Sequence, residues 1–179
     1  QHEIPLETVH YVIEFCYEKG IKIVLNPAPA AAVPMEIIDK VTYVTPNEHE
    51  AVLIFGDELS TEDLLRKYPE KLVITQGSRG VSTCLKDGQI LNVPARKAQV
   101  VDTTGAGDTL NGAFSVQIAE GKAIEDALAY ANVAASLSTE KFGAQTGMPT
   151  AEEVETALKI LNGESVEKEI PVEMELITK

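Results

Sequence analysis

The chain has 179 residues, 44% of them hydrophobic, and a formal net charge of −13 at pH 7. This length suits a single domain with a substantial core, and no stretch approaches the ~20 continuous apolar residues of a membrane span. The acidic balance argues against nucleic acid as a partner, because phosphate backbones are bound by clustered Lys and Arg. Cys16 and Cys84 form no CxxC pair and no disulfide framework, which favours a reducing cytoplasm.

Helix and strand patterns alternate along the chain. Helices are expected over 5–19, 48–55, 61–68, 109–120, 124–139 and 151–161, the last opened by a capping box of Thr150 and Glu153. Strands are expected over 21–25, 41–44 and 71–75, followed by a hairpin of 81–85 and 89–93 that turns at Asp87-Gly88. Because helices separate most of the strands, we predict an α/β fold: a layered, mostly parallel sheet flanked by helices, with one β-hairpin.

The composition changes after residue 162. Residues 163–179 are charged, with alternating apolar positions between Val172 and Ile177. Such alternation favours an edge strand or an extended segment packed on a neighbour, and a disordered tail is the alternative. We therefore expect residues 1–162 to form one folded unit and residues 163–179 to form a C-terminal extension.

The segment from Asp102 to Thr109, Asp-Thr-Thr-Gly-Ala-Gly-Asp-Thr, carries the strongest chemical signal. It places glycines and a carboxylate where an extended segment ends and a helix begins, and the free N–H groups of a helix N-terminus attract anions. The amides of Gly105, Ala106 and Gly107 can form an anion hole. Asp108 can accept a proton from an attacking hydroxyl, as phosphoryl transfer requires. A glycine turn followed by a helix cap explains a bare G-x-G-D equally well.

This octet is similar to the C-terminal signature D-T-x-G-A-G-D of the ribokinase family of carbohydrate kinases, the phosphofructokinase B group. Other family-like segments follow in the same order: L-N-P-A-P-A at 25–30, T-P-N-E-H-E-A at 45–51, T-Q-G-S-R-G at 75–80 and G-A-Q at 143–145. The resemblance covers residues 1–161 and implies the nucleotide-binding part of a cytoplasmic kinase. The implied reaction moves the γ-phosphoryl group of ATP to a hydroxyl of D-ribose, with Asp108 as general base.

The resemblance also implies the cofactors ATP, Mg²⁺ and a monovalent cation such as K⁺. Asn47 and Glu50 match the family's N-x-x-E motif, in which the glutamate acts on magnesium through water. Taken without the family, an Asn N-cap followed by a Glu that complements the helix dipole is the preferred interpretation of this pair.

The implied nucleotide contacts follow the predicted strand 71–75, at the edge where ligands bind in open α/β sheets. A simple turn between two strands is the alternative for this loop. Asn132 matches a family position beside the adenine. The complete set of implied nucleotide contacts is Asn47, Thr75, Gly77, Ser78, Gly80, Gly107 and Asn132.

The implied monovalent-cation site is built mainly from carbonyl oxygens, which leave no side-chain signature. Its residues would be Asp102, Thr104, Ser138, Lys141, Gly143 and Gly147. Gly147 departs from the family pattern, which often has serine at this position.

Glu3 matches a family position that binds a sugar hydroxyl, and a solvated residue near a chain end is the alternative. Family members are longer than this chain, and their N-terminal half supplies most sugar contacts and a β lid that often forms a homodimer. We expect that half to be absent here, so that this chain alone is inactive. Another sugar or nucleoside kinase of the family, a non-catalytic nucleotide-binding module and an interaction fragment remain alternatives.

Overall fold

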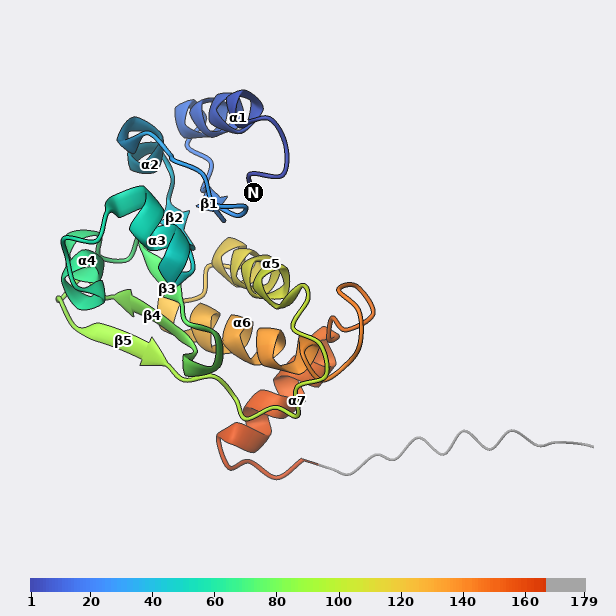
Figure 1. The fold of residues 1–179 in the computed structure, drawn as a ribbon. Helices are drawn as coiled ribbons and strands as arrows, with labels where there is room; N and C mark the ends of the chain where they lie inside the picture. The colour runs from blue at the N-terminus through green and yellow to red at the C-terminus, as the bar shows by residue number, and fades with distance from the viewer. Residues whose placement is uncertain (167–179) are drawn as a thin grey trace, which may run out of the picture.

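The computed structural model describes residues 1–166, so the predicted alternation between Val172 and Ile177 lies outside the described residues. The helices are α1 (Leu6–Glu18), α2 (Met35–Lys40), α3 (Glu48–Phe55), α4 (Thr61–Lys67), α5 (Ala106–Ala119), α6 (Ile124–Ser138) and α7 (Ala151–Leu161), with a 3₁₀ turn η1 (Gly77–Arg79). The strands are β1 (Val24–Leu25), β2 (Tyr43–Val44), β3 (Val73–Thr75), β4 (Val81–Cys84) and β5 (Ile90–Val93) (Figure 1).

The strands follow one another in chain order. β1 pairs with β2 in parallel, and isolated parallel bridges join Val44 to Leu72 and Asn47 to Thr75. β3, β4 and β5 are antiparallel neighbours because their short connections leave no room for a crossover. The predicted α/β fold with its hairpin is confirmed, although parallel pairing stops at β3. Gly88 turns the hairpin with φ +86°, and Asp87 accepts a hydrogen bond from the Gln89 amide at 2.9 Å.

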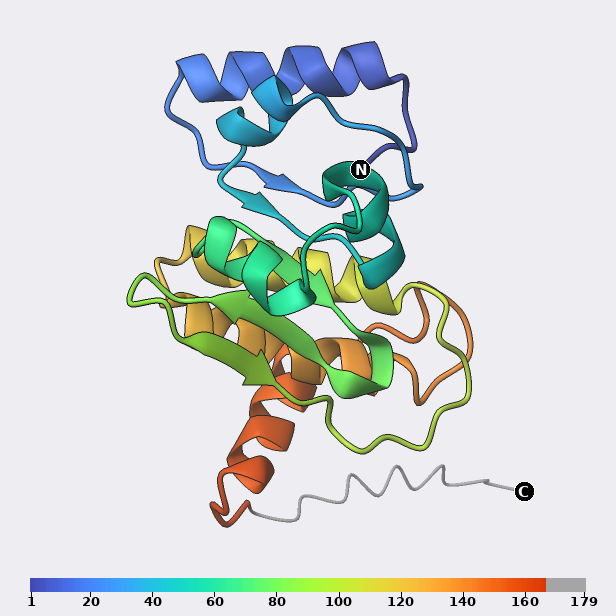
Figure 2. The same ribbon diagram turned by 60° about the vertical axis from the view of Figure 1, so that its left-hand side comes forward.

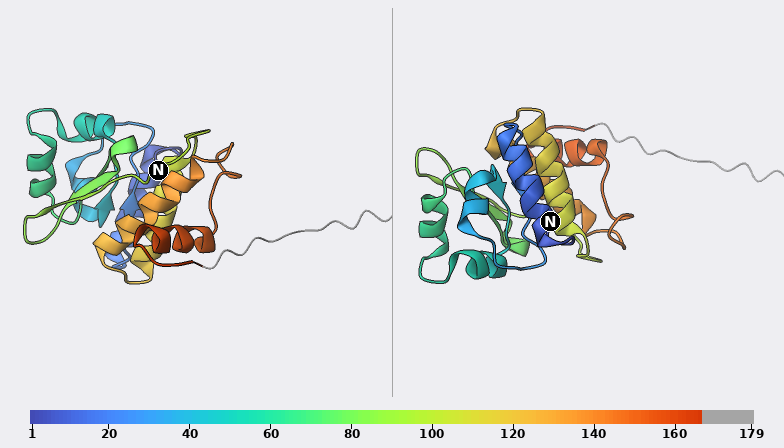
Figure 3. Two further views of the ribbon diagram at one scale, coloured as in Figure 1. Left: turned by 90° about the horizontal axis from the view of Figure 1, so that it is seen from below. Right: turned by 90° about the horizontal axis from the view of Figure 1, so that it is seen from above.

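The sheet separates two hydrophobic cores. Leu72 and Ile74 pack in one core with residues of α1, α2 and α4, whereas Val73 packs in the other with Phe114 of α5 and Leu128 of α6. This division arises because successive side chains of a strand point to opposite faces. α5 and α6 therefore cover one face of the sheet (Figure 2), and α7 packs on the far side of α6 (Figure 3).

The start of α5 differs from the prediction in a way that matters for the site. The helix begins at Ala106 and not at residue 109, because Gly105 takes the left-handed conformation with φ +80° and serves as its N-cap. Asp108 therefore lies in the first turn of α5. α2 and η1 are elements that the sequence patterns did not predict. Within residues 1–166, no helix combines the length and apolarity needed to cross a membrane.

Candidate active site

The N-terminus of α5 presents free backbone donors. Within residues 1–166, no acceptor is bonded to the N–H groups of Gly105 and Gly107, whereas the Ala106 amide donates to the Thr103 carbonyl at 3.2 Å. Two of the three amides of the predicted anion hole are thus available to a ligand. Gly107 and Asp108 are both exposed, and the helix dipole adds partial positive charge at this end. The local structure favours an anion here.

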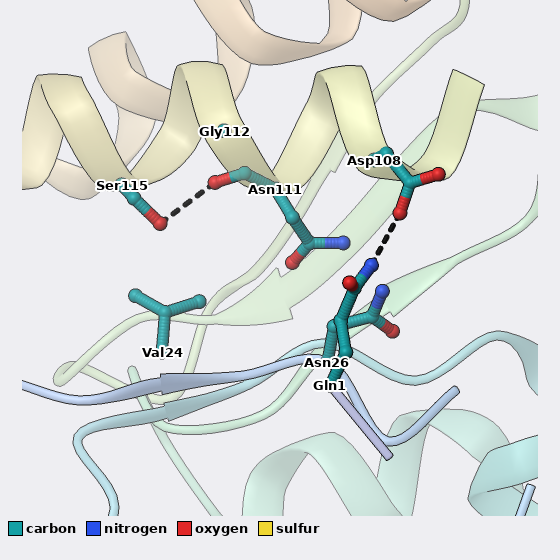
Figure 4. A pocket seen from close by; sticks show the side chains of 7 residues that line it. All are labelled: Gln1, Val24, Asn26, Asp108, Asn111, Gly112 and Ser115. Atoms are coloured by element: carbon teal, nitrogen blue, oxygen red, sulfur yellow. Dashed lines mark hydrogen bonds between the residues drawn. The ribbon is translucent and has the colours of Figure 1, made fainter. Parts of the chain in front are cut away.

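The smaller of two pockets at this terminus has a volume of about 310 Å³, and Asp108 is one of the residues that line it. Side chains of α5 face residues of the N-terminal segment and β1 across it (Figure 4). The Asp108 carboxylate accepts a hydrogen bond from the side-chain amide of Gln1. Asp108 can therefore receive a hydrogen bond from a polar group inside this pocket. The lining consists of Gln1, Val24, Asn26, Asp108, Asn111, Gly112 and Ser115.

The larger pocket, of about 680 Å³, lies on the other side of the first turn of α5. It gathers most of the residues implied as nucleotide contacts: Thr75, Gly77, Ser78, Gly80, Gly107 and Asn132, together with Ala106. A further part of its wall comes from the residues between β5 and the 102–109 octet, which carry no recognisable motif. This part, which sequence reasoning missed, comprises Ala95, Arg96, Lys97, Ala98 and Val100, and Thr103 of the octet lines the pocket next to it.

Gly80 and Asn132, which line the larger pocket, also stabilise its structure. Gly80 is buried with φ +95°, and a Cβ there would lie 2.0 Å from the Val93 carbonyl oxygen. Glycine is therefore required where the loop after β3 crosses the end of β5. Asn132 is only 4% exposed, and its side-chain amide donates to the carbonyls of Pro94 at 2.8 Å and Val93 at 3.2 Å. This side chain anchors the start of the pocket wall.

Asn47 and Glu50 form a capping box at the start of α3. The Asn47 side chain accepts from the Glu50 amide at 2.9 Å, and the Glu50 carboxylate accepts from the Asn47 amide at 2.8 Å. Neither residue lines the two pockets, and the pair lies beside the end of β3, where Asn47 bridges to Thr75. The helix-cap interpretation of these residues is confirmed, and the cap uses one oxygen of the buried Glu50 carboxylate.

Carbonyl oxygens converge near the loop after α6. A Cβ added to Gly147 would lie 2.7 Å from the Ser138 oxygen, 2.8 Å from the Gly143 oxygen and 3.4 Å from the Lys141 oxygen. We call this arrangement of Ser138, Lys141 and Gly143 around Gly147 the carbonyl cradle. Such a cluster of oxygens suits a cation, because each carbonyl carries partial negative charge.

Asp102 fastens the carbonyl cradle to the α5 loop. Its carboxylate accepts from the Thr104 amide and from the Gly143 amide, each at 2.9 Å. Hydrogen bonds from Thr104 and Gly143 hold the pKa of Asp102 below its usual value. All six residues implied for the cation site therefore belong to one contiguous region.

Glu3 is exposed and lies outside both pockets. Gln1, two residues earlier, lines the smaller pocket. In residues 1–166, no group of three or more His, Cys, Asp or Glu side chains is placed to hold a metal ion.

The start of α5, with its free backbone amides, lies between two pockets at the edge of an α/β sheet, an arrangement typical of phosphate-binding domains. The chain belongs to the pfkB family of carbohydrate kinases, which matches residues 1–151. It is 53% identical over 158 residues to the ribokinase of Bacillus subtilis, covering 88% of this chain and 53% of that protein. It is 50% identical over 162 residues to the ribokinase of Lactococcus lactis, and that match covers 90% of this chain and 53% of the other protein.

Solved structures lead to the same family. The Arabidopsis thaliana ribokinase complexed with ribose and ATP has a TM-score of 0.79 at 30% identity, covering 88% of this chain and 54% of that one. The Thermotoga maritima ribokinase has a TM-score of 0.73 at 35% identity, and the match covers 83% of this chain and 52% of that one. The resemblance and the ribokinase-like fold predicted from the sequence are thus confirmed. The chain spans about half the length of the curated relatives it matches.

Proposed function

We propose that this chain is the nucleotide-binding part of an ATP-dependent ribokinase. The observation that carries the proposal is the placement of Gly107 and Asp108, which are consecutive in sequence and line different pockets. In this arrangement ATP occupies the larger pocket, the acceptor sugar occupies the smaller one, and the transferring phosphoryl group lies at the start of α5.

The proposed chemistry needs one proton acceptor and an electrostatic cradle. The Asp108 carboxylate takes the proton of the attacking sugar hydroxyl as its oxygen forms the new bond to the γ-phosphorus. The bond between that phosphorus and its bridging oxygen breaks, and ADP leaves with the electron pair. Backbone amides of Gly105 and Gly107 stabilise the charge on the transferring group, which is the main task of the protein in phosphoryl transfer.

Ribose is the proposed acceptor. The relatives from Bacillus subtilis and Lactococcus lactis, at 53% and 50% identity, are both ribokinases, and the Arabidopsis ribokinase structure is a complex with ribose and ATP. The 310 Å³ pocket offers Asn26, Asn111 and Ser115 as polar groups, in keeping with a small polyhydroxy ligand. A homodimer of the longer protein is part of the same proposal.

Two cations complete the proposal. Magnesium, bound to the phosphates, would meet Glu50 through water, and it would supply charge neutralisation for the transferring group. A monovalent cation would lie among the carbonyls of the cradle and Asp102, where it would supply positive charge behind the anion hole. The donor types fit, because carbonyl oxygens surround Gly147 in the cradle and Glu50 supplies a carboxylate.

A chimera tests the proposed function. The N-terminal half of the Bacillus subtilis ribokinase is joined in front of Gln1, and ADP formation is followed with ribose, fructose or adenosine as acceptor. We expect ribose-dependent ADP formation that exceeds the rate with the other two acceptors. A chimera that binds ATP but phosphorylates none of them would support the non-catalytic alternative. Calorimetry of the 179-residue chain with ADP checks nucleotide binding separately.

A further inference from the structure

The wall of the larger pocket depends on a segment that has no regular structure. Residues 94–105, between β5 and α5, contain no helix or strand, yet they supply much of the lining around the proposed nucleotide. A segment of this kind keeps its shape only through the groups that anchor it.

Besides the hydrogen bond from the Gly143 amide to Asp102, three anchors join this segment to α6 and the residues that follow it. Asn132 holds the carbonyls of Val93 and Pro94. The Thr139 carbonyl accepts from the Val101 amide at 2.7 Å and from the Asp102 amide at 3.1 Å. The third anchor is Glu140, and it differs from the others because it uses opposite charges.

Glu140 binds the segment at two points. Its carboxylate accepts from Arg96, with Nη1 to Oε1 at 2.8 Å and Nη2 to Oε2 at 3.5 Å, and from the Gln99 amide at 3.3 Å. The side chains of Arg96 and Glu140 are 24% and 29% exposed, so solvent screens this pair less than a surface ion pair. The planar guanidinium facing both carboxylate oxygens fixes direction as well as distance.

The position of Glu140 in the chain gives the pair a second consequence. Glu140 directly precedes Lys141, whose carbonyl belongs to the carbonyl cradle, and Arg96 lines the larger pocket. One ion pair therefore connects the cradle with the pocket wall. No motif in the sequence marks either residue.

We propose that Arg96 and Glu140 are positioning residues that couple cation binding at the carbonyl cradle to nucleotide binding in the larger pocket. A cation that orders the loop after α6 fixes Glu140, and Glu140 holds the wall through Arg96 and Gln99. Linkage requires the reverse as well, so nucleotide raises cation affinity by the same factor. This inference rests on the proposed function, because it assumes ADP or ATP in the larger pocket.

The experiment uses the 179-residue chain and calorimetric titration with ADP, in potassium chloride and in choline chloride of equal concentration. In the wild type we expect potassium to tighten ADP binding by about fivefold or more, within the usual range of coupling between sites. Glu140→Gln, which keeps the size of the side chain and removes its charge, should reduce that factor to below about twofold. Arg96→Lys, which keeps the charge and loses the two-pronged geometry, should give an intermediate factor.

Glu14→Gln is the matched control. It alters the Lys40–Glu14 ion pair, 2.6 Å long, which joins α1 to α2 away from both pockets. This variant should bind ADP as the wild type does in both salts. An unchanged potassium factor in Glu140→Gln would overturn the proposed coupling.

Hydrogen exchange separates this inference from the proposed function. The amides of Gln99, Val101 and Asp102 should exchange faster in Glu140→Gln than in the wild type, and at the wild-type rate in Glu14→Gln. Unchanged exchange at these amides overturns the positioning role, even for a variant with altered stability. Failure of the wild-type chain to bind ADP overturns both the coupling and the nucleotide site, while the exchange result still decides whether Glu140 holds the wall.

Discussion

Gly107 and Asp108 are neighbours in the first turn of α5, but Gly107 lines the 680 Å³ pocket and Asp108 lines the 310 Å³ pocket. The division follows from helix geometry, because consecutive residues of a helix point about a quarter-turn apart. A glycine with a free amide therefore lines one pocket, and a carboxylate lines the other. This relationship leads to separate expectations for nucleotide binding and for turnover.

Asp108→Asn should abolish most turnover and leave nucleotide binding intact. Asparagine has the same shape but does not accept the proton, so we expect the turnover of the chimera described above to fall by about 10²- to 10⁴-fold. The dissociation constant of ADP, measured on the 179-residue chain, should change little because the larger pocket is untouched. Turnover at the wild-type rate would show that another group serves as the base.

Gly105→Ala and Gly112→Ala should change stability in opposite directions. Gly105 has φ +80°, and a Cβ there would lie 3.1 Å from Ala144, so alanine should cost about 1–2 kcal/mol of unfolding free energy. Gly112 lies within α5 with open space around its Cβ position, so alanine should stabilise the helix by about 0.5–1 kcal/mol. Urea unfolding of the two variants measures both effects. Equal losses would contradict the assigned conformation of Gly105.

Local chemistry explains which parts of the fold could be predicted. α3 and α7 begin where the sequence predicted, because the capping boxes Asn47–Glu50 and Thr150–Glu153 mark their first turns. The predicted ends of both helices also agree with the structure. α2 was missed because its 6 residues are too few to show a helical period. The early start of α5 was missed since Gly105 and Gly107 favour a turn over a helix interior.

The candidate site also has parts that could be predicted from the sequence and parts that could not. The glycine-rich loops 75–80 and 102–109 can be recognised in the sequence, because the backbone approaches a phosphate closely only where glycine leaves out the Cβ. The wall formed by Ala95, Ala98 and Val100 could not be predicted, since its members line the pocket only through tertiary position. The ion pair of Arg96 with Glu140 spans 44 residues of sequence and leaves no local pattern.

Glu50→Gln should separate a magnesium role from a capping role, with Glu153→Gln as its control. Both glutamates occupy the same position in a capping box, but Glu153 lies at the start of α7 away from the larger pocket. Glutamine can still accept the backbone hydrogen bond, so Glu50→Gln should lose little stability, whereas Glu153→Gln also loses the charge of the exposed Lys141–Glu153 ion pair, 2.9 Å long, which should cost about 0–1 kcal/mol more. Only Glu50→Gln should weaken the effect of magnesium on ADP affinity, measured by calorimetry with and without the ion. An undiminished magnesium effect would leave Glu50 as a helix cap alone.

Gly147→Ala should remove the response of the chain to potassium. The added methyl group would lie 2.7 Å from the Ser138 carbonyl oxygen and 2.8 Å from the Gly143 carbonyl oxygen. It would therefore push these oxygens apart or occupy the space between them. In choline chloride, overpacking should cost about 1–3 kcal/mol. In potassium chloride the wild type should gain stability by mass action, up to about 2.7 kcal/mol at a hundredfold excess over the dissociation constant. Thermal unfolding in the two salts measures this gain, and an equal gain in Gly147→Ala would place the cation elsewhere.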